Sequence, residues 1–264
     1  MRESGLFHHL IAEEYSRESL AKIEEILESH GTHEILRIAH GLFTASPSQA
    51  RESLTGCQNV RVRDNVMVAN SFRLRSQHTP AIVCMKGLTL FLETQRPRFH
   101  EIITDPTRAL KEDANRRPHI RFTAQSLGEL PEKWPHAQND ALDRALWFLR
   151  SCKRRDAAFD RRLFPDYFEA IEFWRDEDSG PWEEGRKVNN PSVGAVVAGL
   201  EEMPKYFSES TPASAPGVVP ISTGRSEKLE MLTQKGTERL ATTLPFEAPP
   251  ERLVVPRRCF CCVP

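Results

Sequence analysis

The chain has 264 residues, of which 39% are hydrophobic and 28% are charged, and its formal net charge is -1 at pH 7. This composition is typical of a globular, soluble protein, and it excludes a fibrous or fully disordered chain. The near-neutral charge gives no electrostatic reason to expect a nucleic-acid partner.

Neither the start of the chain nor its apolar runs indicate a targeting or membrane segment. The apolar residues 5–7 are too few for the core of a signal peptide. No apolar run approaches the roughly 18 residues that a membrane span needs. The six cysteines are scattered or terminal, so we expect no disulfide framework and a reducing, cytoplasmic location.

In chain order, five segments carry apolar residues at helical spacing and predict helices, around residues 20–31, 79–92, 142–149, 164–171 and 190–203. Gly31 is the expected C-cap of the first helix, and Pro80 and Pro191 mark the starts of the second and the fifth. A Ser/Thr/Pro-rich connector, 208–226, precedes a last helix at 227–240. Residues 59–62 are a weak strand candidate, so the sequence predicts an all-α fold.

Three short segments, which we call the first, second and third box, combine polar and aromatic residues at residues 61–69, 134–142 and 178–194. In the third box, Glu183 and Glu184 follow Trp182 on a Gly/Pro-rich loop. An acid that cleaves a glycosidic bond must be protonated near neutral pH, and an aromatic wall can desolvate it to that end. Glu183 is therefore a candidate catalytic acid, and the alternative is a solvated loop edge.

Taken in this order, the boxes resemble the glycoside hydrolase family 15 glucoamylases and their relatives, the glucoamylase-like region of the phosphorylase kinase regulatory subunits. The resemblance runs from about Ile35 to Leu244. It implies part of an (α/α)6 toroid at 1–207, followed by the connector at 208–226 and by a last partial helix and irregular tail at 227–264. It also implies an α-glucan or oligosaccharide ligand. We expect no cofactor and no metal.

The resemblance assigns roles to residues of all three boxes and to Arg121 upstream of the second. Arg63 and Asp64 would grip the terminal sugar, because a carboxylate accepts from adjacent hydroxyls and a guanidinium offers a fixed fork of donors. Asp64 as a helix cap and Trp134 as a core residue are the alternatives. The implied substrate-binding residues are Arg63, Asp64, Arg121, Trp134, His136, Gln138, Asp140, Trp182 and Glu184.

Two residues depart from the family pattern. Arg61 stands where the family usually has an aromatic residue, and His136 replaces an arginine with a donor that titrates near neutral pH. An inverting mechanism also needs a base carboxylate about 6.5–9.5 Å from the acid. The family carries that base later in its chain, and the sequence from Arg252 onward departs from the family as though truncated or frameshifted.

Two functions therefore stay open at this point. The first is inverting exo-hydrolysis of α-glucans or oligosaccharides, with activity in doubt because the base is missing. The second is a non-catalytic glucan-sensing or regulatory module. A helical repeat scaffold is disfavoured, because no fixed repeat period is evident.

The end of the chain gives two further expectations. Cys259, Cys261 and Cys262 invite a metal site or prenylation, but they lack a matching ligand pair and a usual terminal residue, so we expect neither. An incomplete toroid would expose an apolar edge. Residues such as Val193, Val197 and Leu200, or the weak helix at 227–240, would form this edge, which predicts self-association.

Overall fold

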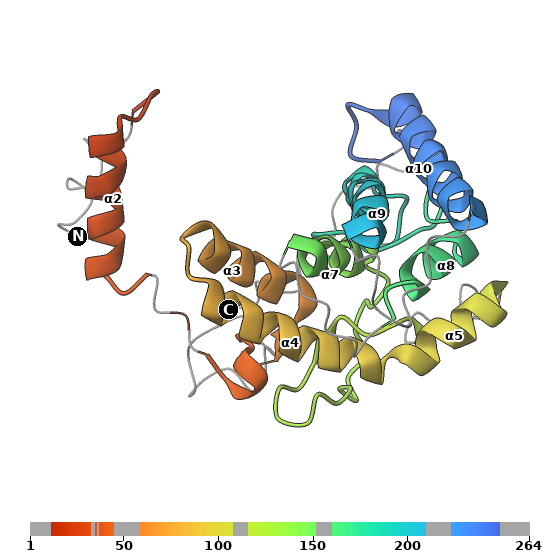
Figure 1. Ribbon diagram of the computed structural model, residues 1–264, viewed down its shortest axis with the longest axis horizontal. Coiled ribbons are helices and arrows are strands. Elements are labelled where there is room, and N and C mark those ends of the chain that lie inside the picture. The colour runs from red at the N-terminus through yellow and green to blue at the C-terminus, as the bar shows by residue number, and fades with distance from the viewer. Residues whose placement is uncertain are drawn as a thin grey trace. The chain divides into compact units, whose positions relative to one another are not determined.

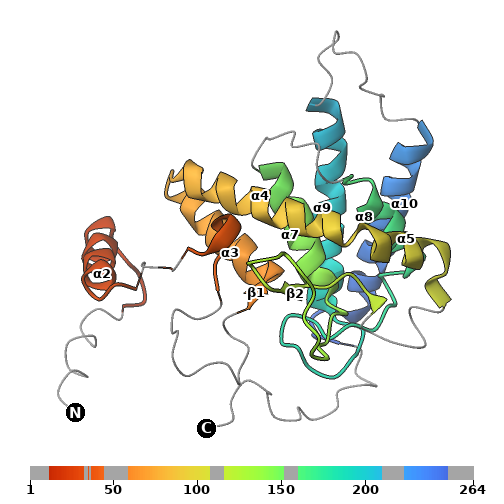
Figure 2. The ribbon, with the colours of Figure 1, turned by 90° about the horizontal axis from the view of Figure 1, so that it is seen from below.

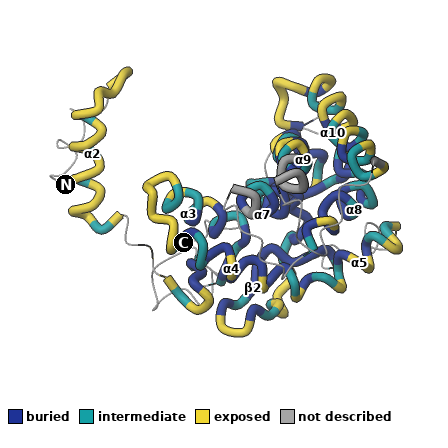
Figure 3. Tube along the Cα trace, in the orientation of Figure 1, coloured by how far each residue is buried: buried dark blue, intermediate teal, exposed yellow. Residues whose placement is uncertain are grey.

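The computed structural model describes residues 12–32, 35, 37–44, 59–107, 116–151, 160–209 and 223–248. The chain forms two compact units, Met1–Leu36 and Arg37–Pro264. The described part of the first unit contains helix α2 (Arg17–Ser29), whose first turn is capped by the Ser16 hydroxyl. Gly31 follows the helix with a φ of 66°, the left-handed conformation expected of a C-terminal glycine. No residue of α2 is buried, which agrees with the predicted surface helix (Figure 3).

The second unit is mostly helical, as the sequence predicts (Figure 1). Its elements, in chain order, are η1 (Ala39–Gly41), β1 (Val60–Arg61), α3 (Val62–Leu74), α4 (His78–Thr94), α5 (Arg96–Thr104), β2 (Arg121–Phe122), α7 (Asn139–Ser151), α8 (Leu163–Ala170), α9 (Asn190–Glu209) and α10 (Thr223–Thr243). The two short strands pair antiparallel, with Val60 opposite Phe122 (Figure 2). The pairing sets the start of α3, which follows β1 directly, beside β2.

Helix-to-helix packing builds the core of this unit. Helix α3 packs on both α4 and α7, α7 packs on α9, and α9 packs on α10. The ring of Phe122 stacks on that of Phe91 with centroids 3.6 Å apart, which fastens β2 to α4. A second aromatic group joins α5 to α8, where Phe99 meets Phe164 and Tyr167 edge to face. Both contacts lie in the buried core. The stacking of Phe122 on Phe91 holds the end of the segment 116–122 against α4.

The last two helices differ from the sequence predictions. Helix α9 runs to Glu209 and α10 begins at Thr223, so both extend into the predicted connector, and residues 210–222 lie outside the described part. Gly236 of α10 approaches α9 so closely that an added Cβ would lie 2.3 Å from Val197 Cγ2. Because α10 covers this face of α9, Val193, Val197 and Leu200 are buried. The predicted exposed edge built from them is therefore wrong.

Smaller points concern helix starts and the tail. Helix α4 begins at His78, so Pro80 is its third residue and not its first. Proline is still tolerated there, because the first-turn amides have no partner within the helix. The terminal cysteines lie outside the described residues. Within the described ranges, no helix has the length and apolar character to cross a membrane.

Candidate functional site

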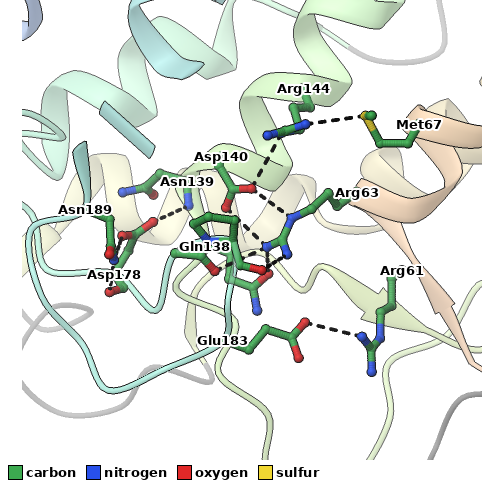
Figure 4. Close-up of polar contacts among 12 residues, drawn as sticks. Arg61, Arg63, Met67, Gln138, Asn139, Asp140, Arg144, Asp178, Glu183 and Asn189 are labelled. Carbon is green, nitrogen blue, oxygen red and sulfur yellow. Dashed lines mark hydrogen bonds and ion pairs between the residues drawn. The ribbon is translucent and has the colours of Figure 1, made fainter. Parts of the chain in front are cut away.

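The guanidinium of Arg63 joins all three boxes (Figure 4). Its Nη2 donates to Asp140 Oδ1 at 3.2 Å, and its Nε lies 2.8 Å from Oδ2 in an ion pair. Nη2 also donates to the side-chain carbonyl of Gln138, and Nη1 donates to the backbone carbonyl of Pro181. The start of α3, the start of α7 and the loop before α9 therefore meet at one side chain.

Asp140 is fully buried in the first turn of α7. Besides Arg63 it faces Arg144, whose Nε lies 3.7 Å from Oδ2. The position at a helix N-terminus adds a favourable dipole to these two charges. Because the donors of Arg63 are committed to acceptors of the protein, a sugar must displace one of those acceptors to reach them. The sugar-gripping role of Arg63 thus requires an exchange of partners.

Asp64 lies next to Arg63 in the first turn of α3 and is half-buried. Burial raises the pKa of its carboxyl, while the charges of Arg61 and Arg63 act in the opposite direction. The cap position of α3 is held by Arg61, and Asp64 is the third helical residue. Asp64 is therefore not the N-cap residue of α3, and its carboxyl lies close to Arg61 and Arg63.

The loop that carries the candidate acid is closed by a backbone bridge. The amide of Asp178 donates to the carbonyl of Lys187 at 2.9 Å, and the reverse bond is 3.0 Å long. Gly180 has a φ of 60°, and an added Cβ would lie 2.7 Å from Asn189 Cγ, so the turn requires glycine there. Glu183 also has a left-handed φ of 56°. For a residue with a side chain this costs roughly 1–2 kcal/mol, which the closed loop must offset.

Arg61, and not an aromatic wall, sets the surroundings of Glu183. Arg61 Nη1 lies 3.6 Å from Glu183 Oε1, and the glutamate side chain is only 13% exposed. Trp182, which the sequence predicts as the wall, is 63% exposed. The desolvation expected from its ring is thus not provided by a packed contact.

Trp134 lies at the border between the core and the arginines of the site. It is partly buried and packs against the hydrophobic core. The guanidinium carbon of Arg121 lies 4.1 Å from its ring centroid, and that of Arg61 lies 5.1 Å away. Both contacts are in the range of cation–π attraction. A sugar that stacks on this ring must therefore move one of the two arginines.

Two of the predicted substrate-binding residues are engaged elsewhere. His136 is buried, stacks on His119 with ring centroids 3.7 Å apart, and accepts the backbone N–H of Ile120 at Nδ1. Burial and the neighbouring His119 lower the pKa of His136 to about 3, so the predicted titration near neutral pH is wrong. The carboxylate of Glu184 binds Lys187 Nζ at 3.0 Å, within the loop itself.

A buried polar network, which the sequence analysis missed, holds the ends of the loop. Arg117 is bidentate to Asp176, with bonds of 2.7 and 2.6 Å, and Asp176 also accepts from Asn139 Nδ2 at 2.9 Å. The carboxylate of Asp178 accepts from the backbone N–H of Asn139 at 3.0 Å and from Asn189 Nδ2 at 2.7 Å (Figure 4). Burial raises the pKa of Asp178 to about 6 despite these bonds. The alternation of Asp176 and Asp178 before the loop is the one sequence signal that could have pointed to this network.

The side chains of this site can bind a ligand through hydrogen bonds and charge, and Glu183 is the one candidate for a catalytic acid. Among the residues that the structure describes, no group of three or more His, Cys, Asp or Glu side chains could hold a metal ion. The arrangement offers arginine donors, carboxylate acceptors and two tryptophan rings, which are the groups that bind sugar hydroxyls and sugar faces.

Comparison with known proteins informs on the fold of this chain alone. No family model matches the sequence, and no curated protein is similar to it at a significant level. A wild-type glycosidase structure aligns with a TM-score of 0.62 at 18% identity, over 84% of this chain and 57% of that chain. A glycosidase variant in complex with glucose aligns with a TM-score of 0.60 at 16% identity and the same coverage. The chain thus has a glycosidase-like helical fold and spans 57% of the length of those structures.

Proposed function

We propose that this chain is a glycoside hydrolase family 15-like, carbohydrate-active protein built on part of an (α/α)6 toroid. In this proposal its three boxes bind the terminal sugar of an α-glucan or oligosaccharide. The observation that carries the proposal is the meeting of the three boxes at Arg63, which brings Asp140 and the Trp182–Glu183 loop to one place. Residues far apart in a sequence that converge in this way are what a binding or active site requires.

Each group has a definite task in the proposed site. Asp64 accepts hydrogen bonds from sugar hydroxyls, and the exposed ring of Trp182 is free to stack on a sugar face. Glu183 donates a proton to the glycosidic oxygen. Asp140 does not serve as the base, because Arg63 and Arg144 both hold its carboxylate. Inverting turnover then depends on a base carboxylate that the family resemblance places outside the three boxes.

The contact between Arg61 and Glu183 favours a second candidate, a glucan-sensing module that binds without turnover. A catalytic acid must carry a proton when the substrate arrives. The guanidinium of Arg61 lies 3.6 Å from Glu183 Oε1, so an ion pair already engages the carboxyl that would protonate the substrate. A protein that only binds glucan has no need of the protonated acid, and can keep this pair.

Binding and turnover of maltotriose separate the two candidates. Calorimetry measures binding, and NMR detects released glucose and its anomer. The hydrolase predicts β-glucose from the wild-type protein and a loss of about 10²- to 10⁴-fold in rate in Glu183→Gln, with binding retained. The sensing module predicts binding in both proteins and release in neither. Glu172→Gln, which alters an exposed pair with Arg175, is the matched control. Absence of binding in the wild-type protein would refute both candidates.

A further inference from the structure

We infer that the proposed site takes a sugar acid, a glycoside whose terminal sugar carries a carboxylate, and that Arg61 is the residue that selects it. This inference rests on the proposed function and narrows its substrate class from neutral glucans to uronosides. Arg61 and Arg63 lie two residues apart, but their N–H donors have different partners.

The terminal donors of Arg61 and Arg63 are used differently. Nη1 and Nη2 of Arg63 donate hydrogen bonds to Asp140, Gln138 and the loop carbonyls. The Nε atom of Arg61 is buried and has no hydrogen-bond partner among the described residues. Its one ion pair with a described residue, Glu183, is 3.6 Å long, beyond the 2.7–2.9 Å that is typical of a charge-assisted hydrogen bond. A largely buried guanidinium whose donors lack hydrogen bonds is stabilised when a ligand supplies an acceptor.

The position of Arg61 allows a ligand to supply that acceptor. Its side chain keeps 16% of its surface exposed, and that of Glu183 keeps 13%. In Figure 4 this pair lies apart from the group around Arg63, so its partners can change without breaking the link between the boxes. The guanidinium of Arg121, on the ring of Trp134, adds a second positive charge nearby.

A carboxylate is the anion that suits this place best. The planar fork of a guanidinium forms two parallel hydrogen bonds to a carboxylate, and Arg61 now forms neither with Glu183. A ligand carboxylate would take this place and displace the glutamate. A neutral sugar leaves the ion pair between Arg61 and Glu183 intact. The charge of the ligand therefore decides both how tightly it binds and whether Glu183 is released from Arg61.

The charge balance of the site agrees with an anionic ligand. Arg61 and Arg63 lie beside three carboxyl groups, Asp64, Asp140 and Glu183, while Arg144 also contacts Asp140 and Arg121 lies on the ring of Trp134. Asp140 is held by Arg63, but Asp64 is half-buried beside two arginines with no ion pair of its own among the described residues. The four arginines outnumber the three carboxyl groups by one, so the cluster carries a net positive charge, which a sugar carboxylate neutralises.

Ligand titrations monitored by NMR test the inference with the full chain. The probes are methyl α-glucuronoside, its uncharged methyl ester, methyl α-glucoside and glucose 6-phosphate. The wild-type protein should bind the glucuronoside about 10- to 100-fold more tightly than the ester or the glucoside. Arg61→Gln should remove this preference, so that the glucuronoside and its ester bind with equal affinity. Arg96→Gln is the matched control, because it removes the same charge from a surface pair with Glu93.

Each other outcome overturns a defined part of the reasoning. Equal binding of the glucuronoside and its ester refutes the sugar-acid class and leaves the proposed function standing. Tighter binding of glucose 6-phosphate assigns the anion to a phosphate and also refutes that class. A preference that survives in Arg61→Gln refutes the role of Arg61. Binding of none of the four sugars refutes the proposed function together with the inference. If Arg61→Gln fails to fold, the four wild-type affinities still decide the ligand class.

Discussion

Replacement of Arg117 by methionine should destabilise the second unit strongly, because it leaves a buried carboxylate without its counter-ion. The side chains of Arg117 and Asp176 are 0% and 3% exposed, and two short hydrogen bonds join them. Removal of one partner from such a pair typically costs about 3–5 kcal/mol. Methionine keeps the apolar stem of the side chain, so the loss reports the charge and its bonds and not a cavity.

The structure places the expected loss at the lower end of that range. Asp176 keeps the hydrogen bond from Asn139 at 2.9 Å, and Arg186 Nη2 lies 4.0 Å from Asp176 Oδ1. Both contacts lower the free-energy cost of keeping Asp176 charged without Arg117. We therefore expect a loss of about 3 kcal/mol in the free energy of unfolding. For a unit of this size that corresponds to a fall of about 6–12 °C in the melting temperature.

Urea denaturation followed by circular dichroism measures this loss, provided that the slope of the transition is unchanged. Arg117→Met combined with Asp176→Asn should recover at least half of it, because the amide removes the buried charge and still accepts from Asn139. Arg175→Met is the matched control, since this neighbouring arginine pairs with Glu172 at the surface, and should change stability by less than about 0.5 kcal/mol. The reasoning is refuted if Arg117→Met loses less than about 1 kcal/mol, or if Asp176→Asn restores nothing.

Three further predictions concern the loop and the helix interface. The folded protein binds a proton at Asp178 more tightly than the unfolded chain does, because burial raises the pKa from 3.8 to about 6. The contribution of this carboxyl to the free energy of unfolding should therefore fall as the pH rises from about 4 to 6, by at most about 1.4 kcal/mol per pH unit. Urea denaturation of Asp178→Asn should lack this slope, and an unchanged profile would assign it to another group. Gly199→Ala should cost about 1–3 kcal/mol, because the added Cβ would lie 1.9 Å from Asp143 Oδ1 between α7 and α9, and an unaltered thermal melt would contradict this. Trp182→Ala should leave the melt unchanged within the effect of a surface substitution yet weaken the binding of any sugar that the wild-type protein takes up, and equal affinity in calorimetry would remove Trp182 from the proposed site.

The helices were predictable because their signals are local. Apolar residues at helical spacing indicate α4 and α9 without knowledge of any partner. The ends were less certain: the Ser/Thr/Pro-rich composition predicted a connector where α9 and α10 still run, because packing of α10 on α9 outweighs weak local preference. The burial of Val197 likewise depends on which helix covers it, which a stripe of apolar residues does not reveal.

The site was predictable in part, for a similar reason. The family resemblance placed Arg63, Asp140 and Glu183 in one site, and the structure does bring these segments together. The partners of each side chain depend on contacts between distant segments. Arg117 and Asp176 are 59 residues apart, and no spacing rule connects them. His136 reads as a titratable donor in the sequence, but burial beside His119 keeps it neutral.

The junction at Arg63 has a consequence for how the site comes into being. Its acceptors lie 75, 77 and 118 residues further along the chain, at Gln138, Asp140 and Pro181. Contacts of such long range form only after large loops have closed, which makes them costly in chain entropy. No fragment that lacks one of the three segments can assemble this junction. A ligand that binds here therefore stabilises only the completely folded unit, and its affinity can serve as a reporter of native assembly in refolding experiments.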